Sequence, residues 1–482
     1  MVLALLLVAL PLAFAFAALA VPSERTRPLL LPVGGAAHFA LAVAALLSLR
    51  HGGVSAFGGW IELDPVSAIV LGLTSLLFFV SALYAPGYLC LRTERKNRVF
   101  CAALFGFLAM MSLVAESHQL GLMWVAMEAT TLASAPLLYF NKSARSLEAT
   151  WKYLLVGSVG IALALLGTLF LAYSALQTGQ HSSLLFTDLV AVAPHLSRPW
   201  LHAAFVLLFV GYGTKMGLAP MHTWKPDAYG EAPGIVGTLL AGGLTSCAFL
   251  AVLRFFHICA AAGDAAFARR LLVALGLLSM AVAGVFMARQ RDYKRLLAYS
   301  SVEHMGILVL GIGIGGEAVF GSLLHLINNG LTKGVLFLAA GNIHRAYGSK
   351  RTDEVSGALK KTPASAALLL AGFFAITGTP PFGPFLSEFT IVRAAFVEGR
   401  FVVGAAILGL LFVVFVGMGA AVLSVVQGKP REPQKETGFR DSLLTVGPPC
   451  VLLALVLCLG IYIPRPLDGM LHSAAAFIEA RP

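Results

Sequence analysis

The sequence predicts an all-α polytopic membrane protein, and three observations support this fold class. Hydrophobic residues make up 58% of the 482 residues and charged residues only 12%, roughly half of the 25% that is usual in soluble domains. Apolar runs of around 18 residues or more recur along the chain, and each is long enough to cross a hydrocarbon core of about 30 Å as a helix. Lysine and arginine gather in every second loop between these runs. These features exclude a soluble fold.

The apolar runs predict about 14 transmembrane helices. The first run ends in AFAFAALA and could imitate a signal peptide, but no basic residue precedes it, as a signal peptide requires. We therefore expect a membrane helix there. The runs lie near residues 2–20, 31–49, 66–90, 99–116, 119–140, 152–174, 201–219, 234–256, 270–288, 296–315, 318–343, 364–393, 401–427 and 444–463.

Positive charge predicts the orientation of these helices. With fourteen crossings, the odd-numbered loops lie on one side of the membrane, and they carry 23 of the 34 lysines and arginines. The opposite side carries 9, while Lys215 and Lys333 lie inside predicted spans. Because basic loops stay in the cytoplasm, we expect both termini outside it, with Arg254, Arg269 and Arg270 as the chief exceptions. The formal charge of +11 therefore reports topology and does not indicate a nucleic-acid partner.

Two of the predicted spans contain a break. Pro220 follows Lys215 by five residues in the seventh run, and Pro380, Pro381 and Pro384 interrupt the twelfth. Proline removes a backbone donor from a helix. Irregular backbone at membrane depth is tolerated only where it is buried in protein or lines a cavity. The sequence thus predicts broken helices 7 and 12.

Three ionisable residues accompany these breaks. Lys215 lies near the end of span seven, Glu388 follows the break in span twelve, and Glu128 lies near the middle of span five. A charge at the centre of a bilayer costs roughly 2.5–3.5 kcal/mol on insertion scales, so such residues mark ion or proton pathways. Lys215 could instead snorkel to the interface, Glu388 could belong to a loop, and Glu128 could be a structural partner of a lysine.

Helix eleven carries a polar stripe. His325, Asn329 and Lys333 stand at i, i+4 and i+8, which places them on one face of a helix. Taken singly, His325 or Lys333 could be a satisfied core residue. Their common face favours an ion relay.

Further candidates lie in span ten and beside the first break. Glu303 and His304 lie deep in span ten, where histidine suits proton exchange, although a buried, hydrogen-bonded histidine is an equal alternative. His222 and Asp227 are expected to shape the broken helix or line its mouth. Lys225 is expected to be a topogenic loop charge.

The spacing of polar landmarks predicts an internal repeat. Lys215 and Glu388 are 173 residues apart, and Glu128 and His304 are 176 apart. An odd number of helices per unit requires the second unit to be inverted, and paired broken helices in inverted halves indicate a transport site. We predict helices 1–3 in residues 1–98, a first five-helix repeat in 99–258, a second, inverted repeat in 265–427, and a cytoplasmic loop with helix 14 in 428–482.

No motif for bound cofactors or metals is found. The six cysteines show no CxxC or Cys/His pairing, so neither a disulfide framework nor an iron–sulfur or haem site is indicated. GIGIGG at 311–316 fits GxGxxG, but it ends a membrane helix and lacks the surrounding strand and crossover unit. We expect no cofactor, no metal and no catalytic chemistry in this chain.

Five segments carry a family resemblance. WVAMEATTLASAPLLYF, TKMGLAPMHTWKPDA, RLLAYSSVEHMG, HLINNGLTKGVLFLAAG and PPFGPFLSEF resemble the characteristic helices of the antiporter-like subunits of respiratory complex I, multisubunit Na⁺/H⁺ antiporters and membrane-bound hydrogenases. The similarity runs from about residue 100 to 423. The sequences of the first segment and of HTWKPDAYGEAPG are most similar to the F subunit of hydrogenase-4 type complexes, which are related to formate hydrogenlyase.

The resemblance implies a role for each site residue. Glu128 matches the helix-five glutamate that modulates its neighbour, Lys215 the helix-seven lysine, and Glu388 the ionisable group at the break in helix twelve. His325 and Lys333 match the helix-eleven relay. All are expectations from the family.

Helix eight departs from the family pattern. Many relatives carry a lysine or histidine there, whereas this chain offers only Thr245, Ser246 and Cys247. Ordered water held by these side chains would have to fill the gap. Glu303 from helix ten is a second hypothesis for the missing group.

The resemblance implies a proton-translocating subunit of a redox-driven complex, expected to be a hydrogenase-4 type [NiFe] hydrogenase. Its partners would be other membrane subunits, a peripheral redox arm and the lipid bilayer, in a bacterial inner membrane with both termini periplasmic. Alternatives are a subunit of a multisubunit Na⁺/H⁺ antiporter or of NADH-quinone oxidoreductase, and a non-conducting scaffold of the hydrogenase. The transported ion is expected to be H⁺, with Na⁺ as the alternative.

Overall fold

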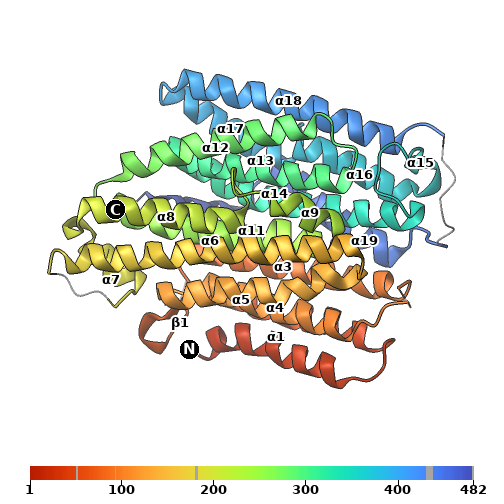
Figure 1. Cartoon of the computed structure of the whole chain (residues 1–482), viewed down its shortest axis with the longest axis horizontal. Coiled ribbons are helices and arrows are strands. Elements are labelled where there is room, and N and C mark those ends of the chain that lie inside the picture. The colour runs from red at the N-terminus through yellow and green to blue at the C-terminus, as the bar shows by residue number, and fades with distance from the viewer. Residues whose placement is uncertain (50–52, 93, 180–182, 430–437, 480–482) are drawn as a thin grey trace.

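The computed structural model describes residues 1–49, 53–92, 94–179, 183–429 and 438–479 and is almost entirely helical. In Figure 1 the long helices run roughly side by side along one direction, with α1 (Val2–Ala20) at one edge of the molecule and α18 (Phe401–Val426) at the other. This arrangement confirms the predicted all-α fold class.

Twelve helices in the described part of the chain are long and apolar enough to cross a membrane. Their ends lie within about five residues of the predicted runs, except that the sixth helix begins eight residues earlier than predicted. Besides α1 and α18 they are α2 (Leu30–Ser48), α3 (Pro65–Leu89), α4 (Arg98–Glu116), α5 (Leu120–Leu138), α6 (Ala144–Leu176), the continuous helix Gly234–Ala261, α12 (Ala265–Met287), α13 (Tyr293–Ile314), α14 (Glu317–Tyr347) and α19 (Leu443–Ile461).

The two remaining predicted spans are interrupted, as the prolines predict. α8 (Arg198–Met216) stops just after Lys215, and the chain resumes as α9 (Trp224–Glu231). α16 (Pro363–Ile376) likewise stops, and α17 (Gly383–Val397) follows after six residues that are not helical. Together with the twelve continuous helices, these pairs are compatible with the fourteen predicted spans.

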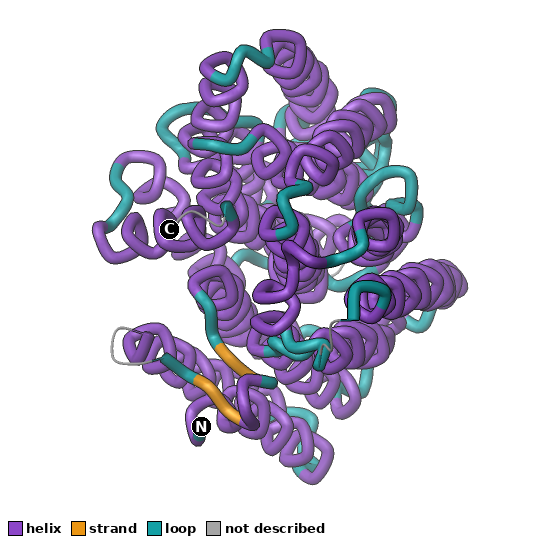
Figure 2. The backbone as a smooth tube through the Cα atoms, turned by 90° about the vertical axis from the view of Figure 1, so that its left-hand side faces the viewer, coloured by secondary structure: helices purple, strands orange, loops and turns teal. Residues whose placement is uncertain are grey.

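Short elements complete the described chain. β1 (Ser55–Ala56) pairs antiparallel with β2 (Ile61–Glu62), and Figure 2 shows this hairpin beside the N-terminal end of the chain. α20 (Arg465–Ile478) follows the last span and buries Leu471, Ala474 and Ile478 on one face. The sequence did not predict this helix. The other elements are α7 (Phe186–Val192), α15 (Ala358–Lys361) and the 3₁₀ turns Arg27–Leu29, Phe57–Gly59, Tyr139–Asn141 and Ala193–His195.

Burial separates central helices from peripheral ones. Of the 18 most apolar consecutive residues, 100% are buried in Gly234–Ala261 and 94% in α14. In α1 and α18 only 22% of the corresponding residues are buried. A polar group on a central helix therefore faces protein and not lipid. This places the whole helix-eleven stripe inside the molecule.

The helix predicted as span eight is irregular near its middle. α10 (Gly234–Thr238) and α11 (Thr245–Ala261) are joined by a π-helical segment, Leu239–Leu244. Such segments occur often at functional sites. The irregular turn immediately precedes the three small polar residues of this helix.

Arg254, an exception to the predicted charge asymmetry, is a structural residue. Its Nη2 lies 3.3 Å from Asp64 Oδ2 and 2.8 Å from Ser67 Oγ. Asp64 also accepts the Ser67 backbone N–H at 2.7 Å, so it caps the amino end of α3. Burial alone raises the pKa of the Asp64 carboxyl, but the His118 hydrogen bond and the Arg254 charge outweigh burial and hold that pKa well below its ordinary value. The basic residue thus reports packing and not topology.

Candidate functional site

Lys215 lies in the last turn of α8 and is fully buried. Its Nζ lies 3.2 Å from Glu128 Oε2, and it also donates to the Thr131 hydroxyl. Positive charge is favourable at the carboxyl end of a helix. An ammonium that is itself fully buried and contacts two side chains of α5 does not snorkel, so the interfacial interpretation of Lys215 is wrong.

Glu128 is held in place from two helices. Ser158 of α6 donates to Glu128 Oε1 at 2.9 Å, and Thr131, one turn further along α5, donates to Oε2 at 3.3 Å. Its side chain is 23% exposed while that of Lys215 is 0% exposed. The carboxylate is therefore the member of the pair that a neighbouring subunit or water can reach.

The end of α8 is built by residues that follow the break. Gly217 has φ of 79°, which only glycine adopts freely. Trp224 Nε1 then donates to Thr214 O at 2.9 Å, and Lys225 Nζ donates to Met216 O at 2.6 Å. The last carbonyls of a helix have no partner within it. The second half of the broken helix thus supplies donors to the first half.

Lys225 is not the loop charge that the sequence predicts. It is 0% exposed, and its Nζ lies 3.0 Å from Ser301 Oγ of α13. The prediction fails because the chain does not leave the protein after Pro220 but continues as α9, packed between α6 and α13. Its position inside a predicted break was the signal that could have identified it as a buried residue.

A second polar cluster lies at the other break. His304 Nδ1 and His325 Nε2 are 2.9 Å apart, and His325 Nδ1 lies 2.9 Å from Ser387 Oγ. Glu388 Oε1 lies 4.0 Å from His304 Nδ1. Glu388 is buried within α17, so the loop interpretation of this residue is wrong. The structure brings helices ten, eleven and twelve together at these four side chains.

The rest of the helix-eleven stripe is also buried. Lys333 Nζ donates to Ser300 Oγ at 2.7 Å and approaches Leu297 O at 3.5 Å. Asn329 is buried, and its Oδ1 has no hydrogen-bond partner among the described residues. Glu303 Oε2, 3.9 Å from His304 Nε2, is unpartnered in the same sense and interacts electrostatically with Lys333.

Comparison with known proteins identifies the family. The sequence pattern of the NADH:quinone oxidoreductase/Mrp antiporter transmembrane family matches residues 117–415. This chain belongs to that family. A hydrogenase-4 component F homolog of Methylacidiphilum infernorum is 35% identical over 86% of this chain and 88% of the relative. NADH-quinone oxidoreductase subunit N of Desulforudis audaxviator is 31% identical over 83% of this chain and 81% of the relative.

Solved structures share the fold. A chain of the Mrp complex from Dietzia superposes with a TM-score of 0.87 at 21% identity, over 99% of this chain and 98% of that one. A chain of Thermus thermophilus complex I gives 0.76 at 25% identity, over 95% and 97%. The protein is thus an antiporter-like, multi-pass membrane subunit of the kind found in complex I-like assemblies, as the resemblance implies. All five residues expected to form the relay lie within the matched region.

Helix eight of this antiporter-like subunit contributes little to the polar clusters described above. Ser246 Oγ donates to Gly242 O at 2.5 Å and Thr245 Oγ1 to Ala241 O at 2.7 Å, both within their own helix. Cys247 Sγ lies 3.6 Å from Met111 O of α4. Each of the three side chains therefore uses its hydrogen-bond donor on a backbone carbonyl. The structure does not bring the predicted supporting residue Ser246 into contact with the other site residues.

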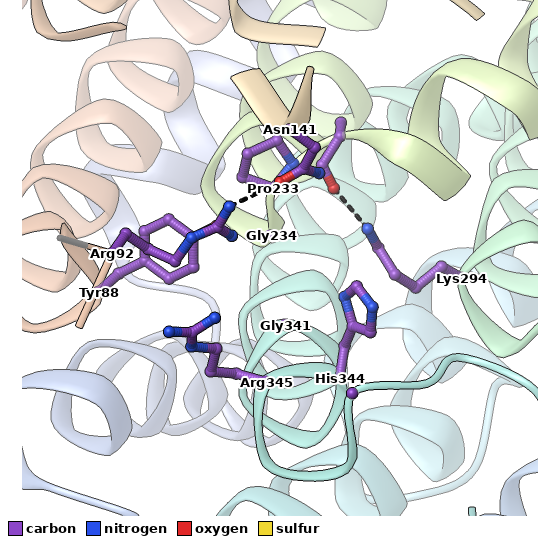
Figure 3. Close-up of a pocket in the computed structure, with 11 residues that line it drawn as sticks. Tyr88, Arg92, Asn141, Pro233, Gly234, Lys294, Gly341, His344 and Arg345 are labelled. Carbon is purple, nitrogen blue, oxygen red and sulfur yellow. Dashed lines mark hydrogen bonds between the residues drawn. The ribbon is translucent and has the colours of Figure 1, made fainter. Parts of the chain in front are cut away.

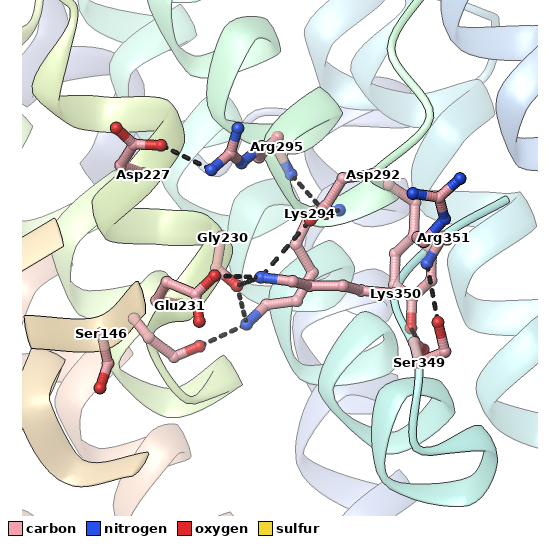
Figure 4. A network of polar contacts seen from close by, with 12 residues as sticks. Ser146, Asp227, Gly230, Glu231, Asp292, Lys294, Arg295, Ser349, Lys350 and Arg351 are labelled. Atoms are coloured by element: carbon pink, nitrogen blue, oxygen red, sulfur yellow. Dashed lines mark hydrogen bonds and ion pairs between the residues drawn. The ribbon is translucent and has the colours of Figure 1, made fainter. Parts of the chain in front are cut away.

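His222 and Asp227 line a cavity beside the first break, as expected of residues at its mouth. The cavity measures about 530 Å³ and also contacts α6 and α13. Asp227 accepts from Lys152 at 3.0 Å and from Arg295 at 2.7 Å, and Figure 4 shows the latter pair. His222 Nδ1 lies 3.2 Å from Pro220 O. A cavity with charged and polar side chains thus lies directly beside the break.

A smaller basic cavity lies at the carboxyl end of α14. It measures about 180 Å³ and is lined by Arg92, Lys294, His344 and Arg345 together with neutral residues. Figure 3 shows the Arg92 guanidinium donating to Asn141 near the beginning of helix Gly234–Ala261. In the sequence, the lysine and the two arginines counted only as positive charges of the loops, and His344 was not singled out.

His304, His325 and Glu388 also have the geometry of a metal site. One ligand atom from each lies within 4.8 Å of the others, and two histidines with a glutamate are a known zinc ligand set. However, the charges of Lys333 and Lys225 act on His304. Positive charge on either lysine opposes a divalent cation more strongly than a single proton, because the repulsion scales with the charge of the bound ion.

Proposed function

We propose that this subunit moves protons across a bacterial inner membrane, driven by a redox reaction in other subunits of a hydrogenase-4 type [NiFe] complex. The ion pair of the buried Lys215 with Glu128 at the first break is the observation that carries this proposal. An intramembrane ion pair marks a transport path more often than a structural feature. The similarity to a hydrogenase-4 component F homolog supports the choice of complex.

The proposed mechanism is electrostatic. With Glu128 ionised, the ammonium form of Lys215 is favoured, and neutralising or withdrawing Glu128 removes that support. Two unit charges about 4 Å apart interact by roughly 4 kcal/mol at an effective dielectric constant near 20, which corresponds to about a thousandfold change in proton affinity. Lys215 then releases its proton towards helix eleven.

The second cluster provides the next acceptors in this proposal. Lys333 and His325 lie on one helix, and His304 lies within hydrogen-bonding distance of His325. Glu388 at the second break is the proposed last group. We assign the two breaks to two inverted five-helix units, residues 99–258 and 265–427, with both termini periplasmic. Each unit would form one half-channel.

Replacing either member of the ion pair tests the proposal. We expect Lys215→Ala and Glu128→Gln to abolish or strongly impair proton pumping while the complex assembles. The measurement is redox-driven acidification in vesicles that contain the purified complex, with the redox rate recorded in parallel. An unaltered proton-to-electron ratio in both variants contradicts the relay. Sodium-dependent pH changes without redox substrate would assign the subunit to Na⁺/H⁺ exchange instead.

A further inference from the structure

We propose that Lys225 is a proton-carrying residue that joins the two halves of the path, in the place where the middle of helix eight offers only Thr245, Ser246 and Cys247. The inference rests on the proposed function, because it assigns one more residue to the same path. It also differs from the family pattern, since Lys225 stands on the second half of the broken helix seven.

The position of Lys225 is fixed by close packing. Its side chain folds back across Gly217, where an added Cβ would meet Lys225 Cδ and Cε at 2.5 Å. Its ammonium then reaches Met216 O at 2.6 Å and Ser301 Oγ at 3.0 Å. The side chain thus points into the protein between α8 and α13.

A polar network holds α9 at its far end. Glu231 Oε1 lies 2.6 Å from Lys350 Nζ, which lies 3.4 Å from Asp292 Oδ2 beside α13 (Figure 4). Lys350 and Lys294 both donate to Gly230 O. These contacts keep α9 against α13, so Lys225 stays buried.

Lys225 lies between the two clusters of the site. Lys215, one residue before Met216, extends from the end of α8 towards Glu128. Lys225 of α9 contacts the same end of α8 and extends towards α13. On α13 the adjacent hydroxyls of Ser300 and Ser301 accept from Lys333 and Lys225 respectively. The ammonium of Lys225 thus contacts the residue that follows Lys215 on one side, and on the other side a serine of α13 whose neighbour in the chain contacts Lys333.

The surroundings of Lys225 favour proton exchange over a fixed charge. Among the described residues, no carboxylate oxygen lies within ion-pair distance of its ammonium, whereas Lys215 has Glu128 at 3.2 Å. Lys225 and Lys333 also interact as like charges. A buried cation without a counter-ion, beside a second cation, gives up its proton more readily than a paired one. A state in which only one of Lys225 and Lys333 carries a charge is therefore favoured over a state in which both do.

The transfer moves one proton per step. When Glu128 is neutralised, the Lys215 ammonium loses a proton and the neutral Lys225 amine gains it. The Lys225 ammonium then returns to the amine as Lys333 gains the proton. Each step breaks one N–H bond and forms another, and no oxidant or reductant takes part.

A structural role is the competing explanation, because Lys225 also caps α8. Glutamine retains a donor for Met216 O but cannot take up or release a proton as an acid or base. Arginine retains both the donor and the charge but does not deprotonate in proteins. Histidine can exchange a proton. The three variants therefore separate capping from transfer.

The test measures redox-driven acidification and the redox rate in vesicles that contain the assembled complex. We expect K225Q and K225R each to lower pumping at least about tenfold, a loss of roughly 1.4 kcal/mol or more, while K225H keeps part of the activity and shifts its pH profile. K360Q, at an exposed lysine of α15, is the control and should pump normally. Wild-type pumping in K225Q or K225R overturns the inference.

Lys215→Ala in the same assay separates this inference from the proposed function. If Lys215→Ala blocks pumping while K225Q and K225R do not, Lys225 is only a cap. If Lys215→Ala also pumps normally, the proposed function itself is wrong. If K225Q and K225R fail to assemble but K225H assembles and pumps with an unchanged pH profile, Lys225 is structural as well.

Discussion

The two broken helices place charges of opposite sign at opposite helix ends. Lys215 lies in the last turn of α8, beside the carbonyl end of that helix, and Glu388 lies in the second turn of α17, close to the amino end of that helix. A helix favours a cation at its carboxyl end and an anion at its amino end. Each break therefore suits the charge that it carries.

The two charges differ in how firmly they are held. Lys215 has a carboxylate at 3.2 Å and a hydroxyl partner. Glu388 Oε1 has no hydrogen-bond partner among the described residues, and it lies 4.0 Å from His304 Nδ1. In the proposed mechanism, the first break stores a proton on a paired group. The second break exchanges it on a loosely held acid beside two imidazoles.

Removing the acid of the second break should have the largest effect on this comparison. Glu388→Gln keeps the size of the side chain but cannot ionise, so we expect pumping to fall at least about tenfold. Redox-driven acidification in reconstituted vesicles measures the loss. Because the Lys215–Glu128 pair is untouched, the complex should assemble normally. If Glu388→Gln pumps like the wild type, the second break is not an exit and the comparison fails.

Glu303→Gln should have a smaller effect. Glu303 interacts electrostatically with both Lys333 and Glu388, so its removal should alter both without deleting a carrier. We expect a loss of about threefold to tenfold, since a longer-range charge interaction is weaker than a direct pair. The comparison with Lys215→Ala is the informative one. Equal damage in the two variants would make Glu303 the substitute for the missing helix-eight group and leave Lys225 a lesser role.

The sequence was sufficient to predict what depends on local chemistry. Long apolar runs set the helix positions, and Pro220 and Pro380 marked the two breaks. The charge of Lys215 was conspicuous because nothing else in its span is charged. The burial of Lys225 depends on where α9 packs after the break. Loop charges and buried charges look alike when lysines are counted by loop, so only tertiary structure separates them.

The same limit explains the other surprises. Arg254 was an unexplained exception because its partner, Asp64, is 190 residues away. Ser246 was a plausible bridge until the direction of its hydroxyl was known. Side-chain direction follows from backbone contacts that a linear pattern does not contain. Polar stripes such as that of His325 and Lys333 are predictable because a helix itself sets their common face.

A glycine beside Glu388 offers a more indirect test of the second break. Gly378 has φ of 65°, and a Cβ there would collide with the Glu388 carboxylate. Gly378→Ala should therefore displace the acid and strain the backbone, lowering pumping about threefold. Gly409→Ala on α18, where a Cβ meets nothing within 4 Å, is the matched control and should pump normally. Equal behaviour of the two alanine variants would show that the position of Glu388 is not critical.

The smallest effect is expected at Ser246, and it tests whether helix eight takes part at all. Its hydroxyl donates to Gly242 O within its own helix, so removing it should leave pumping within about twofold of the wild type. Ser301→Ala is the matched comparison, because the hydroxyl of Ser301 accepts from Lys225. We expect Ser301→Ala to be the more damaging of the two serine variants in the vesicle assay. If Ser246→Ala is the more damaging one, the path runs through helix eight, and the link between the two breaks does not pass through Lys225.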